Sequence, residues 1–297
     1  MNHIYRILFS LLLIMKLCDP AFAQSSDDVF EIDDIEIVFS GTNSFEQENI
    51  RGIMALKEGD EFDYETFVQD MERVRKFYFD NGFFDMKVDT SLKFDYSSLE
   101  VDETFKIDEG PRYRIHKLTF EGLEDVSGDV TGRISQPGDM KVYAGGYYSR
   151  DTLKQEILRI VDVLQNNGYA LAEAGSPEVL KIESNIPEMK NKVNINLPFK
   201  TGLIYTFGTT KVSFRGEKYN ITLNDITREL SYKQGQIYRK EEIVKSEINL
   251  SKMSILENPR INFADVDSAS RIINLKIEIF VSKKYELVPE IFTYYFR

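Results

Sequence analysis

The chain has few residues of the types that serve redox and metal chemistry. Its 297 residues include no Trp, one Cys (Cys18) and two His (His3 and His116). No Cys pair or His-x-x-x-His spacing provides a zinc ligand set. No Gly-x-Ser-x-Gly elbow supports Ser-His-Asp catalysis, and close acidic pairs such as Asp102 with Glu103 are expected by chance in so acidic a chain. We therefore predict no enzyme activity, no catalytic residue, no metal site and no cofactor.

Long apolar runs are absent after the N-terminus. The first residues, "MNHIYRILFSLLLIMKLCDPAFAQSS", combine Arg6, an apolar run over Ile7–Met15 and a small-x-small site at Ala21–Ala23, the pattern of a cleaved secretory signal. We assign residues 1–23 to a signal peptide. Two alternatives are a lipoprotein modified at Cys18, although the residues before it are not small, and an uncleaved anchor, although the run is short for a bilayer.

The charge of the exported part is uneven. Between Gln24 and Gly110 there are 8 basic and 24 acidic residues, a net charge of −16. The next segment, 111–202, has 12 of each, and the segment from Leu203 has 15 basic and 12 acidic residues. Phosphates would be repelled by the acidic front, so nucleic acid is not an expected partner. Solvation of the surface is the simplest explanation of the remaining pattern.

A helical pattern with the same ending occurs twice. "FDYETFVQDMERVRKFYFDNGF" from Phe62 aligns with "YSRDTLKQEILRIVDVLQNNGY" from Tyr148. Apolar residues recur in both at steps of +4, +3 and +4, which is one face of an α-helix. These residues are Phe67, Met71, Val74 and Tyr78 in the first copy and Leu153, Ile157, Ile160 and Leu164 in the second.

Each copy ends in Asn-Gly-aromatic. Gly82 and Gly168 can adopt the left-handed conformation that closes a helix. Phe83 and Tyr169 then fall where the chain turns back, and we predict that both fill a core. A third copy over 235–266 is weaker: Glu247 breaks its apolar register, and Pro259 takes the place of the aromatic residue.

Strand-like runs surround each helix. Before it come "IDDIEIVFSG", "YRIHKLTFEG" and "YTFGTTKVSFRG", and after it come two further alternating runs per copy. A short helical segment stands between the first run and the long helix. Each unit therefore has the order β-α-α-β-β.

This organisation resembles a tandem of POTRA domains from outer-membrane assembly factors of the BamA/TamA-like family. The resemblance rests on the junctions "EGPRYRIHKLTFEG" and "TGLIYTFGTTKVSFRG", on "NGF" and "NGY", and on their order over three units. It implies an α+β chain of three tandem β-α-α-β-β domains, each a three-stranded mixed sheet with two helices on one face. Structural turns are expected at Gly110, Gly122, Gly202 and Gly216.

The resemblance divides the chain into segments. We expect the signal peptide to be followed by an acidic linker at 24–31 and three POTRA domains at 32–110, 111–202 and 203–285. The last twelve residues, 286–297, carry four aromatic side chains and would suit the stump of a first strand of a membrane β-barrel, since a barrel follows the last POTRA domain in this family. A tail or a strand of the last domain is the alternative.

The resemblance also implies a binding mode. An open sheet edge offers unpaired N–H and C=O groups to an extended peptide, with little demand on its sequence. The second strand of each unit is the edge exposed in this family. The edge residues expected here are Met86, Lys87, Val88, Asp89, Thr90, Ser91 and Leu92 in the first unit and Val179, Leu180, Lys181 and Ile182 in the second. Charged residues on such an edge can equally protect it from aggregation.

Taken with the export signal, the resemblance implies an arm on the periplasmic side of the outer membrane of a Gram-negative-type bacterium. Its expected partners are unfolded outer-membrane proteins, periplasmic chaperones and assembly lipoproteins, and a barrel would connect it to the membrane. It would bind clients by strand addition and deliver them for insertion or translocation. The alternative is a stand-alone exported adaptor for envelope proteins, and the reading frame beyond Arg297 would separate the two.

Overall fold

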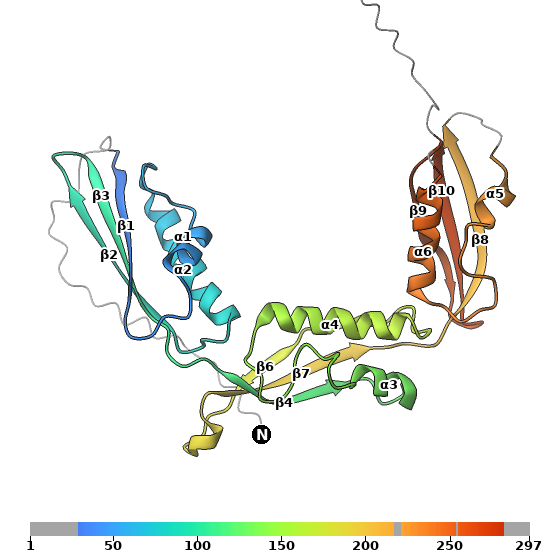
Figure 1. Ribbon diagram of the computed structural model, residues 1–297, viewed down its shortest axis with the longest axis horizontal. Helices are drawn as coiled ribbons and strands as arrows, with labels where there is room; N and C mark the ends of the chain where they lie inside the picture. The colour runs from blue at the N-terminus through green and yellow to red at the C-terminus, as the bar shows by residue number, and fades with distance from the viewer. Residues whose placement is uncertain (1–28, 217–220, 254, 282–297) are drawn as a thin grey trace, which may run out of the picture. The chain divides into compact units, whose positions relative to one another are not determined.

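The computed structural model describes residues 29–216, 221–253 and 255–281. The predicted signal peptide, residues 24–28 of the predicted linker and the predicted strand stump at 286–297 lie outside the described residues. Within the described residues the order β-α-α-β-β occurs three times, with the first of the two closing strands divided in the second repeat (Figure 1). The prediction of three such α+β units is confirmed.

The first repeat forms a three-stranded mixed sheet. Its elements are β1 (Glu31–Phe39), α1 (Gln47–Ile53), α2 (Tyr64–Asp80), β2 (Lys87–Asp95) and β3 (Glu100–Asp108). The sheet order is β1-β3-β2, in which β1 pairs parallel and β2 antiparallel with the central β3. Both helices lie on one face of this sheet (Figure 1).

The second repeat has the same plan with a divided edge strand. Its elements are β4 (Arg114–Glu121), α3 (Gly128–Ile134), α4 (Arg150–Gln165), β5 (Glu173–Ala174), β6 (Glu178–Lys181), a 3-10 turn (Pro187–Met189) and β7 (Lys192–Lys200). The central β7 pairs parallel with β4 and antiparallel with both β5 and β6. Buried side chains from α3, α4 and the sheet form one core.

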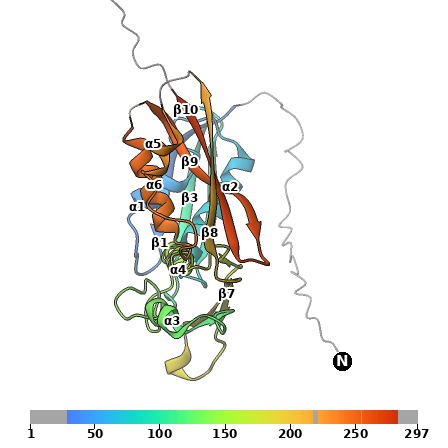
Figure 2. The same ribbon diagram turned by 90° about the vertical axis from the view of Figure 1, so that its right-hand side faces the viewer.

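The third repeat contains β8 (Thr206–Gly216), α5 (Leu223–Thr227), α6 (Lys240–Ser251), β9 (Leu256–Asp267) and β10 (Ile272–Val281). Its sheet order is β8-β10-β9, and α5 and α6 lie on one side of it in the view of Figure 2. The helix α6 is shorter than α2 and α4, and the chain enters β9 soon after it. Pro259 therefore lies within the edge strand and not in a turn that follows the helix, which explains why the aromatic residue is missing there.

The described chain divides into two compact units. The first extends to Phe77 and includes Lys87–Glu109; the second consists of Tyr78–Met86 and the chain from Gly110 onward. The Asn-Gly turn after α2 thus belongs to the second unit. None of the helices among the described residues combines the length and apolar character needed to cross a membrane.

The helix ends follow from backbone conformation. Gly82 and Gly168 have φ of +92° and +97°, a region that residues with a Cβ avoid. The aromatic residues that follow, Phe83 and Tyr169, are 2% and 4% exposed. The other glycines for which turns were expected also have positive φ: Gly110, Gly122, Gly202 and Gly216. At Gly122 a Cβ would lie 2.0 Å from the Phe199 carbonyl oxygen, so a side chain there would collide with β7.

Candidate strand-addition site

In each sheet the start of the first strand, which forms one edge, is covered by the chain itself. The turn before the long helix bonds to the start of the first strand: Gly59 N–H donates to Ile32 O at 2.8 Å, and Phe207 N–H donates to Gln236 O at 2.8 Å. In the second repeat, Ile115 N–H donates to Gly146 O at the same distance. On the opposite edge, β2, β6 and β9 each pair with only one strand among the described residues. The second strand is therefore the more open edge in every repeat.

The first predicted edge lies on β2. Met86 precedes this strand, and Lys87 to Leu92 lie in it. Val88 is buried beneath the helices, Thr90 and Leu92 are half-buried, and the charged residues Lys87 and Asp89, with Ser91, are exposed. The strand thus has an apolar inner face and a polar outer face, which is also typical of an edge protected against aggregation.

The second predicted edge lies on β6. Ile182, one residue beyond the strand, donates its N–H to Lys192 O at 2.9 Å. Backbone groups of an antiparallel strand point alternately to the partner and away from it. Counting back from Ile182, the N–H groups of Val179 and Lys181 point away from β7. Leu180 faces the other side of the sheet and is 61% exposed.

A largely apolar groove of about 450 Å³ lies between α4 and β6. Val179 and Lys181 line it, so the same two residues present a side chain to the groove and an N–H to the open edge. The other lining residues are Phe79, Phe84, Tyr148, Arg150, Leu153, Lys154, Ile157 and Pro177. All of them belong to the second compact unit. An extended peptide paired with β6 would place alternate side chains in this groove.

Aromatic rings form one end of the groove. The ring centroids of Phe79 and Phe84 are 4.5 Å apart, and those of Phe84 and Tyr148 are 5.0 Å apart. Burial raises the pKa of the Tyr148 hydroxyl, so this ring stays neutral. Rings in such contact offer a large apolar surface of fixed shape. The groove therefore suits an apolar or aromatic side chain.

Cations stand at the rim of the groove. Lys181 Nζ is bonded to Asp85, which raises the pKa of the lysine. Asp85 also accepts a hydrogen bond from the Tyr113 hydroxyl at 2.6 Å, and Arg150 pairs with Asp80 at 3.0 Å. These partners fix the positions of the rim cations and keep both protonated at neutral pH.

A buried polar contact that the sequence pattern did not predict holds the long helix in every repeat. Asp70, Glu156 and Ser246 stand eight residues after Phe62, Tyr148 and Tyr238, and all three are 0% exposed. Each accepts a backbone N–H from the residue fifteen positions earlier: Ala55 at 2.7 Å, Lys141 at 2.7 Å and Ser231 at 2.8 Å. The aligned acidic residues Asp70 and Glu156, on a face that is otherwise apolar, were the available signal.

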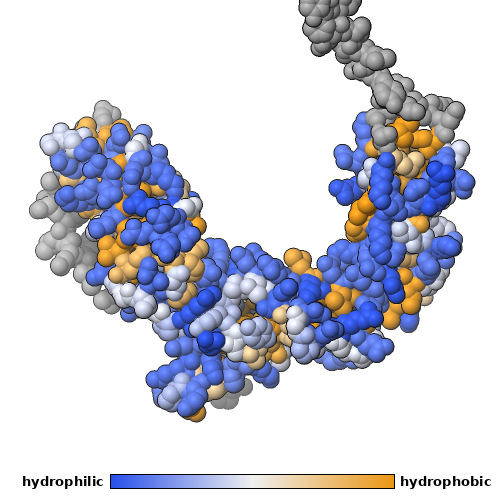
Figure 3. Space-filling model, in the orientation of Figure 1, coloured by the Kyte–Doolittle hydropathy of each residue, from blue (hydrophilic) through white to orange (hydrophobic). Residues whose placement is uncertain are grey.

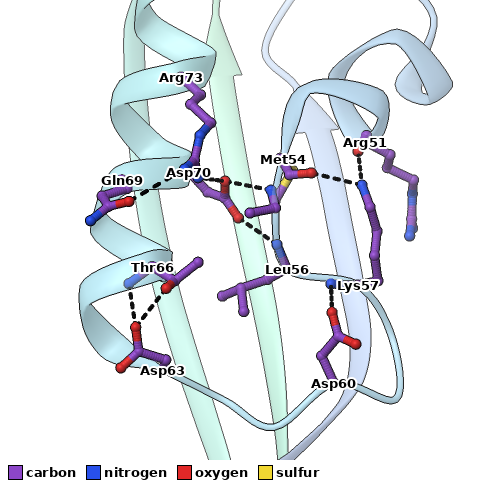
Figure 4. A network of polar contacts seen from close by, with 11 residues as sticks. Arg51, Met54, Leu56, Lys57, Asp60, Asp63, Thr66, Gln69, Asp70 and Arg73 are labelled. Atoms are coloured by element: carbon purple, nitrogen blue, oxygen red, sulfur yellow. Dashed lines mark hydrogen bonds and ion pairs between the residues drawn. The ribbon is translucent and has the colours of Figure 1, made fainter.

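Positive partners complete this contact in two repeats. Asp70 also accepts the Leu56 N–H at 2.9 Å and pairs with Arg73, as Figure 4 shows. Glu156 pairs with Arg159 at 2.6 Å. Buried carboxylates of this kind satisfy backbone groups that would otherwise lack a partner. The contact therefore fixes the connection between the two helices against the long helix.

Glu103 is a buried acid with a different environment. It lies on β3 at 0% exposure, and neither carboxylate oxygen has a hydrogen-bond partner. Burial, and after it the charge of Asp70, raise the pKa of Glu103 to about 7. The parallel pairing of each central strand shifts by at least one residue after Val101, Val193 and Ile273. Glu103 lies two residues after Val101, and the corresponding residues of β7 and β10 are Ile195 and Leu275. Glu103 is enclosed in a core and has no access to a substrate.

Other titratable side chains are dispersed. Asp102 pairs with Lys93 at 2.8 Å, Glu109 accepts the Ser44 N–H at 2.6 Å, and His116 is exposed at an irregularity in β4. The part of the chain that the structure describes contains no group of three His, Cys, Asp or Glu side chains that could hold a metal ion. On the face seen in Figure 3, hydrophilic residues predominate and hydrophobic residues form smaller patches among them. Strand edges are therefore the better guide to a site.

The sequence comparisons connect the fold to known proteins. The POTRA family profile, described as a surface antigen variable number repeat, matches residues 34–110 and 113–202. The chain is 28% identical over 153 residues to outer membrane protein assembly factor BamA of Neisseria meningitidis, covering 48% of this chain and 18% of that protein. It is 24% identical over 185 residues to BamA of Nitratidesulfovibrio vulgaris, covering 61% of this chain and 22% of that protein. The chain thus spans about a fifth of the length of these relatives.

A solved structure has the same fold. The crystal structure of POTRA domains 3–5 of Haemophilus influenzae BamA aligns with a TM-score of 0.52 at 14% sequence identity. The alignment covers 85% of this chain and 96% of that one. It extends the match to a third domain, which the family profile does not reach.

Proposed function

The chain belongs to the POTRA family and is not an enzyme, and we propose that its three domains form a periplasmic arm that binds unfolded outer-membrane proteins by strand addition. The arm would deliver these clients for membrane insertion or translocation. The two BamA relatives are named as outer-membrane assembly factors, which supports this role. Periplasmic chaperones and assembly lipoproteins are the expected further partners.

The observation that carries the proposal is the combination found at β6. Val179 and Lys181 direct their N–H groups to an open edge, and the groove beside them is apolar. Main-chain hydrogen bonds would give affinity without sequence specificity, and the groove would favour peptides with alternating apolar residues. Segments of outer-membrane strands have this alternation.

The test removes one backbone donor. Val179→Pro deletes the outward N–H while the ladder from Leu180 to β7 remains, since proline is tolerated on the solvent side of an edge strand. Val179→Ala is the matched control, because it shortens the side chain and keeps the N–H. The probe is a fluorescent peptide of about ten residues in which apolar and polar residues alternate.

We expect Val179→Pro to weaken binding of this peptide about tenfold, equivalent to about 1.4 kcal/mol, and Val179→Ala to weaken it much less. Fluorescence anisotropy measures both affinities. Equal losses in the two variants would show that the side chain and not the edge N–H binds the peptide, which contradicts strand addition at β6.

A further inference from the structure

We propose that Glu247 closes the edge of β9, so that strand addition is directed to the second repeat and away from the third. This inference rests on the function proposed above. Its physical core, the occupation of an edge N–H by a side chain of the same domain, can be tested without any client.

The contact joins the long helix of the third repeat to its edge strand. Glu247 Oε1 accepts the N–H of Ile261 at 2.8 Å, and Glu247 Oε2 lies 3.6 Å from Arg260. The Glu247 side chain is only 18% exposed. Because the Ile261 N–H bonds to a helix side chain, it does not belong to the ladder with β10 and points to the open side. A carboxylate is a stronger acceptor than the carbonyl of an incoming peptide.

The neighbouring backbone adds to the closure. Pro259 has no N–H to offer, and the pairing of β9 with β10 is irregular between Glu257 and Arg260. Asn258, within this irregularity, has a positive φ of +42°. Bulges and prolines are common means of blunting an edge. The first half of β9 therefore lacks the regular row of free donors that β6 presents.

The repeat alignment places Glu247 at a helix position that is apolar in the other two repeats. The residues nine positions after the aligned Phe62, Tyr148 and Tyr238 are Met71, Ile157 and Glu247. Ile157 lines the groove beside β6, and Glu247 lines a corresponding groove of about 350 Å³ between α6 and β9. A peptide that entered the third groove would have to displace the Ile261 hydrogen bond and leave a carboxylate against an apolar side chain, which is unfavourable.

The test has two parts, both performed on the whole chain. Without peptide, amide hydrogen exchange at Ile261 is compared in the wild type, Glu247→Ile, Glu247→Ala and Glu247→Gln. Glutamine keeps an acceptor oxygen, whereas isoleucine restores the residue type of α4 and alanine removes the acceptor without adding bulk. We expect exchange to accelerate at least tenfold in the isoleucine and alanine variants and little in the glutamine variant.

With the alternating peptide at saturation, protection is read separately in β6 and β9. We expect protection in β6 alone for the wild type and Glu247→Gln, and in both strands for Glu247→Ile. Unchanged Ile261 exchange in the first part, or β9 protected in the wild type, would overturn the closure. A β9 that stays unprotected in Glu247→Ile while β6 is protected would also overturn it. Accelerated Ile261 exchange with protection in neither strand would instead contradict the proposed function and leave the closure standing.

Discussion

The second and third repeats both place a groove between the long helix and the edge strand. In the second repeat the groove contains Ile157 and aromatic rings, and the edge N–H groups of β6 are open. In the third repeat Glu247 occupies the corresponding helix position and bonds the N–H of Ile261. The two domains thus share a scaffold and differ in access to their backbone. A side chain on a helix can thus occupy a backbone donor of a sheet edge.

The buried polar contact of the long helix also differs between these two repeats. The second repeat uses the ion pair of Glu156 with Arg159, and the third uses the hydroxyl of Ser246, which accepts from Ser231 and donates to Glu242 O at 2.7 Å. A buried charge left without its partner costs more free energy than an unpaired hydroxyl. We therefore expect loss of this contact to lower the stability of the two domains by different amounts.

The largest expected effect is on stability in the second repeat. Glu156→Ala would leave the Lys141 N–H and the Arg159 guanidinium without their buried acceptor. We expect the free energy of unfolding of this repeat to fall by about 3–5 kcal/mol. Ser246→Ala in the third repeat should lower it by about 1–3 kcal/mol. Amide hydrogen exchange of β7 and β10 under urea measures each repeat separately, and equal losses would show that the ion pair adds nothing to the contact.

The next effect extends the comparison to the first repeat, where Glu103 replaces an aliphatic core residue. Its pKa is about 7 in the folded chain against 4.5 for an ordinary glutamate. The folded state therefore disfavours the ionised form: the penalty is absent below about pH 4.5, grows as pH rises, and is complete above about pH 7. Full ionisation corresponds to about 3 kcal/mol.

Glu103→Ile should remove this penalty, since Ile195 fills the equivalent position of the second repeat. We expect the variant to unfold at higher urea concentration than the wild type at pH 7.5. The difference should shrink by about 3 kcal/mol as pH falls to about 3.5, where the carboxyl is mostly protonated in both the folded and the unfolded state. Hydrogen exchange of β3 at both pH values measures the stability of the wild type and the variant. A stability difference that does not change with pH would show that folding does not shift the pKa of Glu103.

The smallest effect reverses the difference between the two grooves. Ile157→Glu introduces into α4 the residue type of α6, beside the apolar part of the groove. We expect it to weaken binding of the alternating peptide about tenfold, or about 1.4 kcal/mol, because the carboxylate must be desolvated when the groove is filled. Ile157→Leu is the control. Equal peptide affinity of the Glu and Leu variants would show that the groove does not contribute to peptide binding.

Periodicity and repeats were sufficient to predict the order of elements, whereas the choice of the second strand as the exposed edge came from the family resemblance. The steps of Phe67, Met71, Val74 and Tyr78 specify a helix face because a core accepts only one side of it. Glu247 was visible only as a break in that register. Its hydrogen bond to Ile261 depends on where β9 passes the helix, which the spacing of residues in the sequence does not predict.

Buried polar residues were the harder class. Asp70 and Glu156 align in the sequence, but the backbone N–H groups that donate to them lie in loops fifteen residues earlier. A search for apolar positions does not detect such contacts. Glu103 was seen only as one of many close acidic pairs. Alternation along β3 places it with Val101 and Phe105 on the inner face, so the strand pattern could have revealed it.

In the proposed function an extended peptide pairs with β6 through its backbone. An isotope-edited NOE experiment on the labelled chain with unlabelled alternating peptide tests it most directly. Strand addition at β6 predicts backbone contacts from the amides of Val179 and Lys181 to alternate residues of the peptide, with none from Ile261. Contacts confined to the side chain of Leu180 on the opposite face, with no backbone contacts at β6, would contradict it.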